Sequence, residues 1–215
     1  FYKESKNLKN FQLCADIAYT LQKYVEDKCL EIIKRNIQKT NCKNVCLSGG
    51  FFLNCVSNFN LKKKLDKDIN LYIEPISHDG GTSVGGAKLM YYSSNNDYKK
   101  NPQTSTYYGP IYEKSDITKR VKSENAKSIT YQGVASLLRD NKIVAIYQGR
   151  SEQGPRALGN RSILFNPTNK DGKDIVNTVK KREHFRPFAG TILQEYMNEY
   201  FDMAELEESP FMCYA

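Results

Sequence analysis

The fold of this chain is decided most clearly by the segment IVAIYQGRSEQGPRALGNRSIL, residues 143–164. It begins with an uncharged apolar run from Ile143 to Tyr147 that is rich in β-branched residues. A short run of this kind is typical of a buried strand. Gly149 ends the run, and arginine then alternates with glycine. We therefore predict a buried strand that delivers a polar loop to the edge of a sheet.

The loop after this strand has the residue types of an oxyanion pocket. Arg150, Arg156 and Arg161 are interleaved with Gly154 and Gly159. A guanidinium group presents a fixed fork of donors that matches phosphate oxygens, and glycine lets backbone N–H groups approach an anion closely. The alternative is a solvated basic surface, but such surfaces are usually rich in lysine and poor in glycine. We expect a shaped pocket for a small anion.

A second cationic group follows in the segment KKREHFRPF, residues 180–188. Residues 173–183 have the apolar spacing of a helix, on which Asn177 and Lys180 share one face. The proline that follows Arg186 biases that residue towards an extended conformation. This segment therefore offers further positive charge close in sequence to the first group.

The first forty residues carry a helical period of apolar side chains. These are Cys14, Ile17, Ala18, Leu21, Val25, Cys29, Ile32 and Ile33. Charged residues separate them, so we predict one long amphipathic helix that packs along its apolar stripe against something larger.

Strands and helices then alternate. We expect a buried strand at residues 44–48, a glycine turn at 49–50, a helix over 52–65, a strand at 71–73, a turn at 78–81 and a helix through 84–90. This order predicts a parallel α/β sheet, which binds ligands at the carboxyl ends of its strands. Further on, Ile129 and Tyr131 suggest a strand, and residues 133–140 a short helix.

Composition sets limits on partners and compartment. The 215 residues carry a net charge of +8, which favours anionic partners. No apolar run approaches the roughly 20 residues of a membrane span, so no membrane association is expected. Six cysteines lack metal-finger spacing, which favours a reducing, cytoplasmic setting. Because the chain begins at Phe1 rather than Met, we expect a part of a longer polypeptide, truncated also at its C-terminal end.

Four segments resemble, in order, the motifs of one enzyme family. They are LSGGFFLNCVSN at 47–58, EPISHDGG at 74–81, GRSEQGPRALGNRSIL at 149–164 and KKREHFRPF at 180–188. The family is that of the carbamoyltransferases of nodulation-factor and antibiotic biosynthesis, of the cephamycin and nebramycin type. The first two motifs are also shared with relatives that act in tRNA threonylcarbamoylation, whereas the last two are highly specific.

The resemblance implies a fold and a domain order. Residues 1–95 are expected to be the C-terminal part of an actin-like ATPase domain, and 96–108 a linker. Residues 109–215 resemble the tRNA threonylcarbamoyl-adenylate synthase fold, an α/β or α+β domain. We expect this second domain to form the carbamoyl-adenylate.

The resemblance also implies an activity. The family's O-carbamoyltransferases use ATP to convert carbamoyl phosphate into carbamoyl-adenylate, and pass the carbamoyl group to a hydroxyl of a small-molecule acceptor. ATP, Mg2+ and iron, or another divalent metal, are the implied cofactors. The present chain alone is expected to be incomplete for transfer. The acceptor and the oligomeric state stay open, a homodimer included.

Site residues carry over by motif position. Arg156, Lys180 and Arg186 correspond to the catalytic groups that bind carbamoyl phosphate. Supporting substrate contacts are expected from Arg150, Asn160, Arg161 and Arg182. Nucleotide contacts are expected from Gly49, Gly50 and Asn54. Asp79 corresponds to a metal ligand whose two histidine partners lie outside this chain; in isolation such an aspartate more often bonds nearby backbone N–H groups in its turn.

Two other functions stay open. A non-catalytic basic module related to the tRNA-threonylcarbamoylation proteins would bind RNA, although no tyrosine and arginine cluster of a known RNA-binding pattern occurs. Hydrogenase maturation also uses carbamoyl phosphate, but its acylphosphatase and zinc-finger regions are absent from this sequence. Because no such RNA-binding pattern occurs, nucleic acid is not the partner that we expect.

Overall fold

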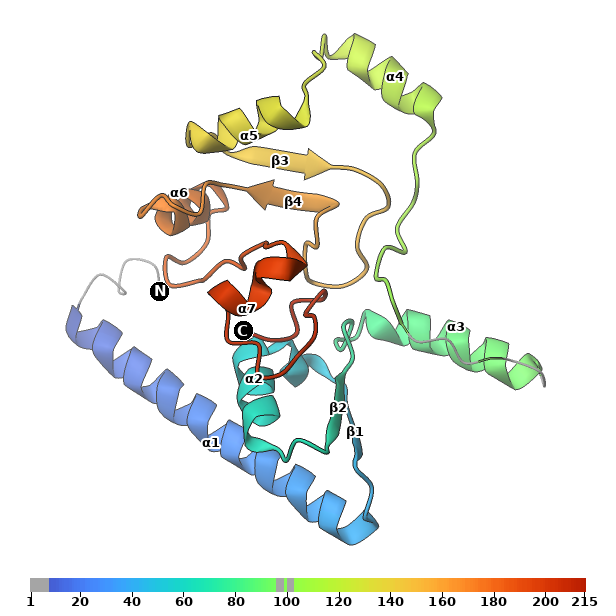
Figure 1. Ribbon diagram of the computed structural model, residues 1–215, viewed down its shortest axis with the longest axis vertical. Helices are drawn as coiled ribbons and strands as arrows, with labels where there is room; N and C mark the ends of the chain where they lie inside the picture. Colours follow the sequence, from blue (N-terminus) through green and yellow to red (C-terminus); the bar gives the residue numbers. More distant parts are fainter. Residues whose placement is uncertain (1–7, 96–98, 100–102) are drawn as a thin grey trace. The chain divides into compact units, whose positions relative to one another are not determined.

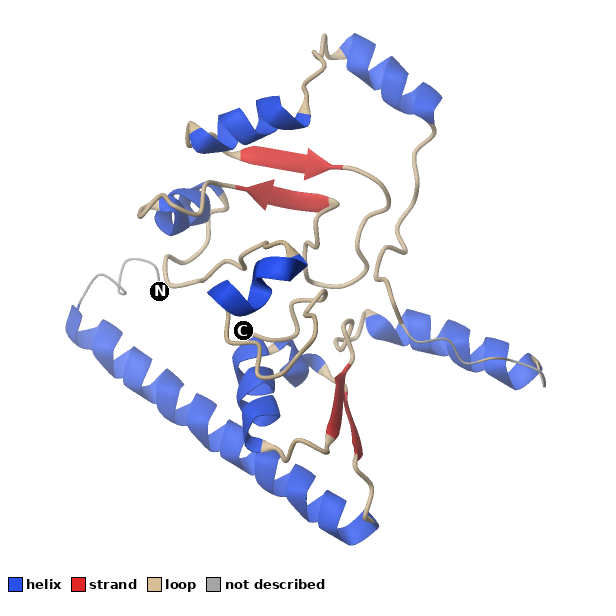
Figure 2. Cartoon of the chain, viewed as in Figure 1, coloured by secondary structure: helices blue, strands red, loops and turns tan. Residues whose placement is uncertain are grey.

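The computed structural model describes residues 8–95, residue 99 and residues 103–215, and of residues 8–10 the backbone alone. The chain divides into two compact units. The first comprises the chain up to Ser94 together with Ile192–Ala215, and the second comprises Asn95–Thr191. Each unit combines helices with a two-stranded sheet, so the mixed α/β class is confirmed at this level (Figures 1 and 2).

In the first unit β1 (Asn44–Leu47) and β2 (Asn70–Ile73) pair in parallel, as predicted. Leu47 lies beside Ile73 in register, and both side chains are buried. The opposite face of the sheet, which carries Tyr72, is exposed. The expected buried strands are therefore buried on one face of the described sheet and open on the other.

Helical segments follow both strands. β1 is followed by η2 (Gly50–Leu53) and α2 (Cys55–Lys64), and β2 by α3 (Gly81–Ser94). The sequence predicts a single helix over residues 52–65. This prediction is wrong, because Asn54 separates η2 from α2. The Asn54 side chain accepts a hydrogen bond from the Ser57 N–H at 3.1 Å and so caps α2.

Helix α1 (Leu8–Thr40) is the long amphipathic helix that the sequence predicts. Ile33 is buried, and Cys29 and Ile37 pack against the core of the first unit. That core consists of Ile33, Leu47, Leu61, Leu65, Ile69 and Ile73. The predicted packing along the apolar stripe is confirmed for the later turns and wrong for the N-terminal half, where Leu21 is exposed. Only the later turns of α1 supply residues to this core.

The last segment of the chain returns to the first unit through η3 (Gln194–Tyr196) and α7 (Met197–Tyr200). The Asn58 side-chain amide donates to the carbonyl oxygen of Cys213 at 2.8 Å, with Asn58 fully buried. Sequence analysis assigned this segment to the second domain. The compact units therefore differ from the expected domains here, whereas the functional boundaries stay a prediction.

The second unit contains α4 (Lys114–Ser123), α5 (Tyr131–Arg139), β3 (Val144–Tyr147), β4 (Arg161–Leu164) and α6 (Gly172–Val179). β3 and β4 pair antiparallel, with Tyr147 opposite Arg161. The strand expected around Ile129 and Tyr131 is wrong. Tyr131 begins α5, because the Thr130 hydroxyl accepts a hydrogen bond from the Gly133 N–H and caps that helix.

None of the helices in the described part of the chain combines the length and the apolar character needed to cross a bilayer.

Candidate functional site

The arginine loop, residues 148–160, connects β3 to β4 and holds Arg150, Arg156 and Asn160 of the predicted carbamoyl-phosphate site. All three glycines of the loop have positive φ angles, and that of Gly149, at its start, is 51°. Gly154 and Gly159 have φ angles of 108° and 106°, which residues with a Cβ rarely adopt. The loop can therefore reverse twice within a short stretch, and Arg156 lies between the two reversals.

Glu152 fills the centre of this loop. Its Oε1 accepts hydrogen bonds from the N–H groups of Leu158 at 2.7 Å, Asn160 at 2.9 Å and Arg161 at 3.3 Å. Burial acts to raise the pKa of Glu152, but these backbone bonds outweigh burial and lower it. No sequence pattern indicated a role for Glu152, which stands among arginines like an ordinary surface residue.

The backbone N–H groups of Leu158, Asn160 and Arg161 are therefore already used. The remaining one in this run, that of Gly159, donates to the Ser162 hydroxyl at 2.9 Å. The expectation that the glycines present backbone N–H groups to a bound anion is wrong for residues 158–161. Recognition of an anion at this loop must rely on side chains or on N–H groups other than those of residues 158–161.

Arg161 is held by main-chain oxygens. Its Nη1 donates to the carbonyls of Gln148 at 2.6 Å and Asn160 at 2.8 Å. The guanidinium also stacks on the Tyr147 ring, with 3.5 Å between the guanidinium carbon and the ring centre. Arg161 thus braces the point at which the arginine loop enters β4.

Arg150 and Asn160 are anchored as well. The Asn160 amide donates to the carbonyl of Arg150 at 2.7 Å, which joins the two ends of the loop. Arg150 Nη1 donates to the carbonyl of Gly109 at 2.9 Å. The structure therefore brings Arg150, Asn160 and Arg161 together within one loop.

A crossing segment, residues 105–109, lies against the arginine loop. The Thr106 carbonyl accepts a hydrogen bond from the Gln153 N–H at 2.6 Å, and the Tyr107 hydroxyl donates to the Leu158 carbonyl at 2.6 Å. Most of this segment falls in the expected linker, of which residues 96–98 and 100–102 lie outside the described residues. Its described part is bonded to the predicted site.

The cationic turn, residues 180–188, follows α6 and is organised by Asn177. This side chain is fully buried, and its Nδ2 donates to the carbonyls of His184 at 3.3 Å and Arg186 at 3.0 Å. Its Oδ1 accepts from Arg182 Nε. Asn177 was noted in the sequence only as a neighbour of Lys180, although a polar residue on an inward helix face was a signal for such a role.

Arg182 is fixed within the turn. Its Nη2 donates to the Pro187 carbonyl at 3.0 Å, and its guanidinium carbon lies 4.1 Å from the centre of the Phe188 ring. Burial, with a smaller effect of Arg186, lowers the pKa of Arg182. Arg182 therefore supports the turn rather than projecting from it.

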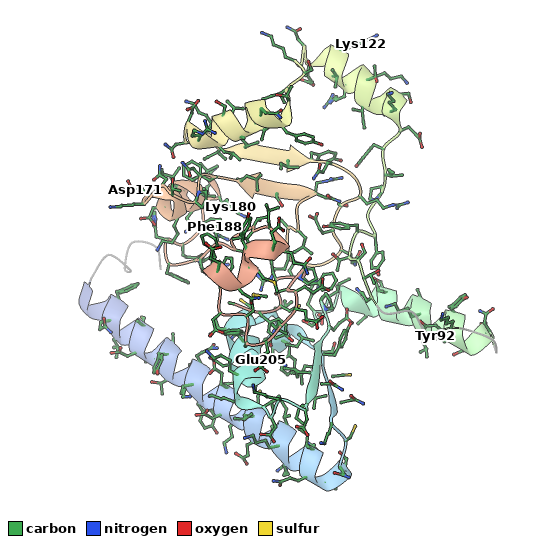
Figure 3. The ribbon with its side chains drawn as sticks, viewed as in Figure 1. Tyr92, Lys122, Asp171, Lys180, Phe188 and Glu205 are labelled. Atoms are coloured by element: carbon green, nitrogen blue, oxygen red, sulfur yellow. The ribbon has the colours of Figure 1, made fainter. Side chains whose placement is uncertain are left out.

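Arg186 and Lys180 are exposed. Arg186 Nε donates to Glu183 Oε2 at 2.6 Å. The Lys180 side chain has no hydrogen bond or ion pair among the described residues, and its Nζ lies 6.0 Å from the Phe188 ring centre (Figure 3). Lys180 is thus a cation whose ammonium group has no ion-pair or hydrogen-bond partner in the described turn, and we call it uncommitted in this sense. The contacts given above join residues within the loop and within the turn, but not the loop to the turn.

The predicted nucleotide residues lie at the carboxyl end of β1. Gly49 has a φ angle of 111°, and its N–H donates to the Ser77 carbonyl at 2.8 Å, which joins the loops that follow β1 and β2. Asn54 Nδ2 donates to Gln22 Oε1 at 2.7 Å. Because Asn54 also caps α2, both ends of its amide are engaged, and a bound nucleotide would have to displace Gln22.

Asp79 lies in the loop that follows β2. Its carboxylate is exposed and has no hydrogen-bond or ion-pair partner among the described residues, which suits a metal ligand. Beside it, His78 Nδ1 accepts the Gly80 N–H at 2.9 Å, and His78 Nε2 is buried without a partner. Within the described ranges no three His, Cys, Asp or Glu side chains gather, so Asp79 fits a metal only as one ligand of several.

One open depression of about 450 Å³ lies on the first unit. β1, β2, Lys62 and Lys67 line it. It contains none of the predicted site residues, and we assign it no ligand.

Comparison with known proteins matches both parts of the chain. A family model described as the carbamoyltransferase N-terminus matches residues 1–88, and one described as the carbamoyltransferase C-terminus matches residues 135–215. The chain is 32% identical to nodulation protein NolNO of Sinorhizobium fredii over 208 residues, which is 92% of this chain and 30% of that protein.

Two nodulation proteins of Bradyrhizobium diazoefficiens are similar to the same extent. The chain is 30% identical to nodulation protein NolO over 206 residues, 92% of this chain and 37% of that protein. It is 31% identical to nodulation protein U over 181 residues, 84% of this chain and 31% of that protein. The chain spans about a third of the length of the curated relatives it matches.

Proposed function

This chain belongs to the carbamoyltransferase family, and on that premise we propose that it is part of an ATP-dependent O-carbamoyltransferase. The observation that carries the proposal is the pair of family models, one on each side of the crossing segment. The uncommitted cation Lys180 of the turn, together with the anchored arginines of the loop and of the turn, supports a small dianion as ligand. The family match gives no support to the RNA-binding alternative, which we do not pursue.

The second domain, by this proposal, forms the carbamoyl-adenylate. Carbamoyl phosphate gives up inorganic phosphate to water, the resulting carbamate oxygen attacks the α-phosphorus of ATP, and pyrophosphate leaves. Arg156, Lys180 and Arg186 hold the dianion and stabilise the charge that builds up on the transferring oxygens. No side-chain nucleophile is needed, because positioning and charge neutralisation account for most of this chemistry.

Arg150, Asn160, Arg161 and Arg182 act in this proposal as supports. All four make hydrogen bonds to main-chain oxygens of the loop, the turn or the crossing segment. A cation held in this way keeps its place before the substrate arrives, and less conformational entropy is lost on binding. Arg186 has to exchange its Glu183 partner for the phosphate, or share it.

The first domain, by this proposal, has the actin-like fold and carries out the transfer. The acceptor hydroxyl attacks the carbamoyl carbon, and AMP leaves. Gly49, Gly50 and Asn54 contact the nucleotide, and Mg2+ accompanies ATP. Asp79 contributes one ligand to an iron or other divalent ion, which when bound polarises an oxygen of the reacting group. The remaining metal ligands come from outside this chain.

The test uses the full-length protein with carbamoyl phosphate and ATP. We expect AMP, pyrophosphate and phosphate in equal amounts, with AMP release that depends on carbamoyl phosphate. Arg156→Ala should abolish this turnover, whereas Arg139→Ala, a change of the same charge on the exposed side of α5, should not. Turnover that is unchanged by Arg156→Ala would refute the assigned role.

A further inference from the structure

We propose that Glu152 is a positioning residue for Arg156, because its carboxylate is a built-in anion around which the arginine loop closes. The final step of this inference, the effect on carbamoyl phosphate, rests on the proposed function. The shaping of the loop rests on the contacts of Glu152 alone.

The contacts are those of an occupied anion site. Leu158, Asn160 and Arg161 stand six, eight and nine positions after Glu152, and all three N–H groups converge on one oxygen, Oε1. Closely spaced backbone N–H groups that point to one place form an anion-binding concavity. In this loop the concavity is filled by the chain's own carboxylate rather than by a ligand.

This closure fixes the two ends of the stretch that carries Arg156. Glu152 binds the chain again at Leu158, so residues 153–157 form a short bridge between two anchored points. The bridge is held a second time at its start, where the Gln153 N–H donates to Thr106, a buried residue. Arg156 lies within this bridge, so the anchor that Glu152 supplies restrains the backbone from which its side chain extends.

An ionised carboxylate suits this role better than a neutral group. It has acceptor capacity only, and hydrogen bonds to an ionised acceptor are roughly twice as strong as neutral ones. The lowered pKa of Glu152 keeps the carboxylate ionised at neutral pH. A glutamine offers one acceptor oxygen but no charge, and its NH2 group would be an additional donor facing N–H donors.

A specific consequence follows for the variant without this side chain. Glu152→Ala leaves three N–H groups without their acceptor, while the backbone that presents them remains. Formate is small enough to take the place of the missing carboxylate. A residue that only filled space would not be replaced by a soluble anion.

The experiment compares the full-length wild type with Glu152→Ala, Glu152→Gln and Glu124→Ala. Glu124, which directly follows α4, is the control. Its carboxylate is exposed and, among the described residues, forms an ion pair only with Arg120. Hydrogen exchange of peptides covering 150–162 reports loop closure, and calorimetric titration with carbamoyl phosphate reports the site. Each is measured with sodium formate and with sodium chloride at equal ionic strength.

We expect Glu152→Ala to lose amide protection over 158–161 and to bind carbamoyl phosphate at least about tenfold more weakly. Formate should restore both, chloride neither, and formate should leave the wild type and Glu124→Ala unchanged. Glu152→Gln should show partial protection and no response to formate. If exchange in Glu152→Ala equals that of the wild type, or formate leaves it unaltered, the proposal is wrong.

Two further outcomes separate the proposals. If Glu152→Ala does not fold, Glu152→Gln decides: wild-type protection together with wild-type affinity overturns the positioning role, and a loss of both supports it. If the wild type binds no carbamoyl phosphate but formate still restores protection in Glu152→Ala, the proposed function fails and the role of Glu152 in the loop stands.

Discussion

Asn177 of α6 donates from its side-chain amide to the main-chain oxygen of Arg186 at 3.0 Å, and Asn177 is fully buried. The same amide accepts a hydrogen bond from Arg182. One buried side chain therefore sets the backbone of a residue assigned to carbamoyl phosphate and the guanidinium of its neighbour. Buried polar groups of this kind are costly to leave without partners.

Asn177→Ala should lower the free energy of unfolding by about 2 to 4 kcal/mol, because two carbonyls and Arg182 lose a partner in a buried place. It should also weaken carbamoyl-phosphate binding, since the cationic turn loses its anchor. Denaturant unfolding and calorimetric titration measure the two effects. The control is Thr178→Ala, which removes an exposed hydroxyl bonded to the Asp174 carbonyl. Equal stability of the two variants would contradict the anchor role.

Lys180→Ala should weaken carbamoyl-phosphate binding without a measurable loss of stability, because the Lys180 side chain is exposed and makes no hydrogen bond or ion pair among the described residues. The adjacent Lys181→Ala removes the same charge from an exposed position and serves as the control. We expect about a tenfold rise of the dissociation constant for the first and less than about threefold for the second. Similar effects in both variants would point to a general charge effect.

Local patterns predicted only part of the regular structure: α4 and β4 were missed, and β3 is not the buried strand that was expected, since each of its residues is half-buried or exposed. The apolar runs at 44–48 and 71–73 predicted the two parallel strands, and the uncharged run ending at Tyr147 predicted β3. Both depend on residues close in sequence, where period and turn residues are informative. The same reasoning failed at residues 129–131. Ile129 and Tyr131 suggested a strand, but the hydrogen bond that Thr130 makes as a helix cap favours a helix there.

The parts that sequence could not predict depend on contacts between distant residues. Gln22 meets Asn54 across 32 positions, and no local pattern connects them. Glu152 is closer to its partners, but its role depends on the way in which two glycine turns fold the loop back. The arginines were recognisable by type, whereas the division between anchored Arg161 and uncommitted Lys180 came only from the structure.

Acid should loosen the arginine loop. The pKa of Glu152 is lowered in the folded chain from its ordinary value of 4.5, so folding is linked to release of a proton. The stability that Glu152 contributes is therefore fully present above about pH 4.5 and is lost as the pH falls through its lower folded value. Denaturant unfolding of the wild type between pH 6 and pH 3 should show this loss as a fall in the free energy of unfolding, as expected for one carboxylate whose pKa changes on folding. Glu152→Gln should lack this part of the pH dependence of stability. Equal pH dependence in the wild type and in Glu152→Gln would contradict the prediction.

Asp79→Asn should reduce bound iron in the full-length protein and slow transfer to the acceptor, while AMP formation from carbamoyl phosphate and ATP continues. The reason is that Asp79 supplies a metal ligand to the first domain, whereas adenylate formation is assigned to the second. Metal content is measured by mass spectrometry on the purified wild type and on each purified variant. Asp66→Asn is the control, an exposed aspartate in the segment before β2. Normal metal content in Asp79→Asn would rule out the ligand role.

Two glycines of α3 should respond in opposite ways to alanine. A Cβ at Gly81 would lie 2.1 Å from the main-chain oxygen of Ile76, so Gly81→Ala must push apart the loop that carries Asp79. A Cβ at Gly85 meets nothing within 4 Å among the described residues. We expect Gly81→Ala to destabilise the chain by about 2 to 4 kcal/mol, as overpacking against backbone does.

Gly85→Ala should stabilise the same chain by up to about 1 kcal/mol, because alanine loses less entropy than glycine in a helix. Urea unfolding of the 215-residue chain compares the two variants under one condition. In the full-length protein Gly81→Ala should also release metal, since the main chain around Asp79 shifts. A Gly81→Ala chain as stable as Gly85→Ala would mean that the loop between Ile76 and α3 yields without cost, and Gly81 would then have no part in holding Asp79 in place.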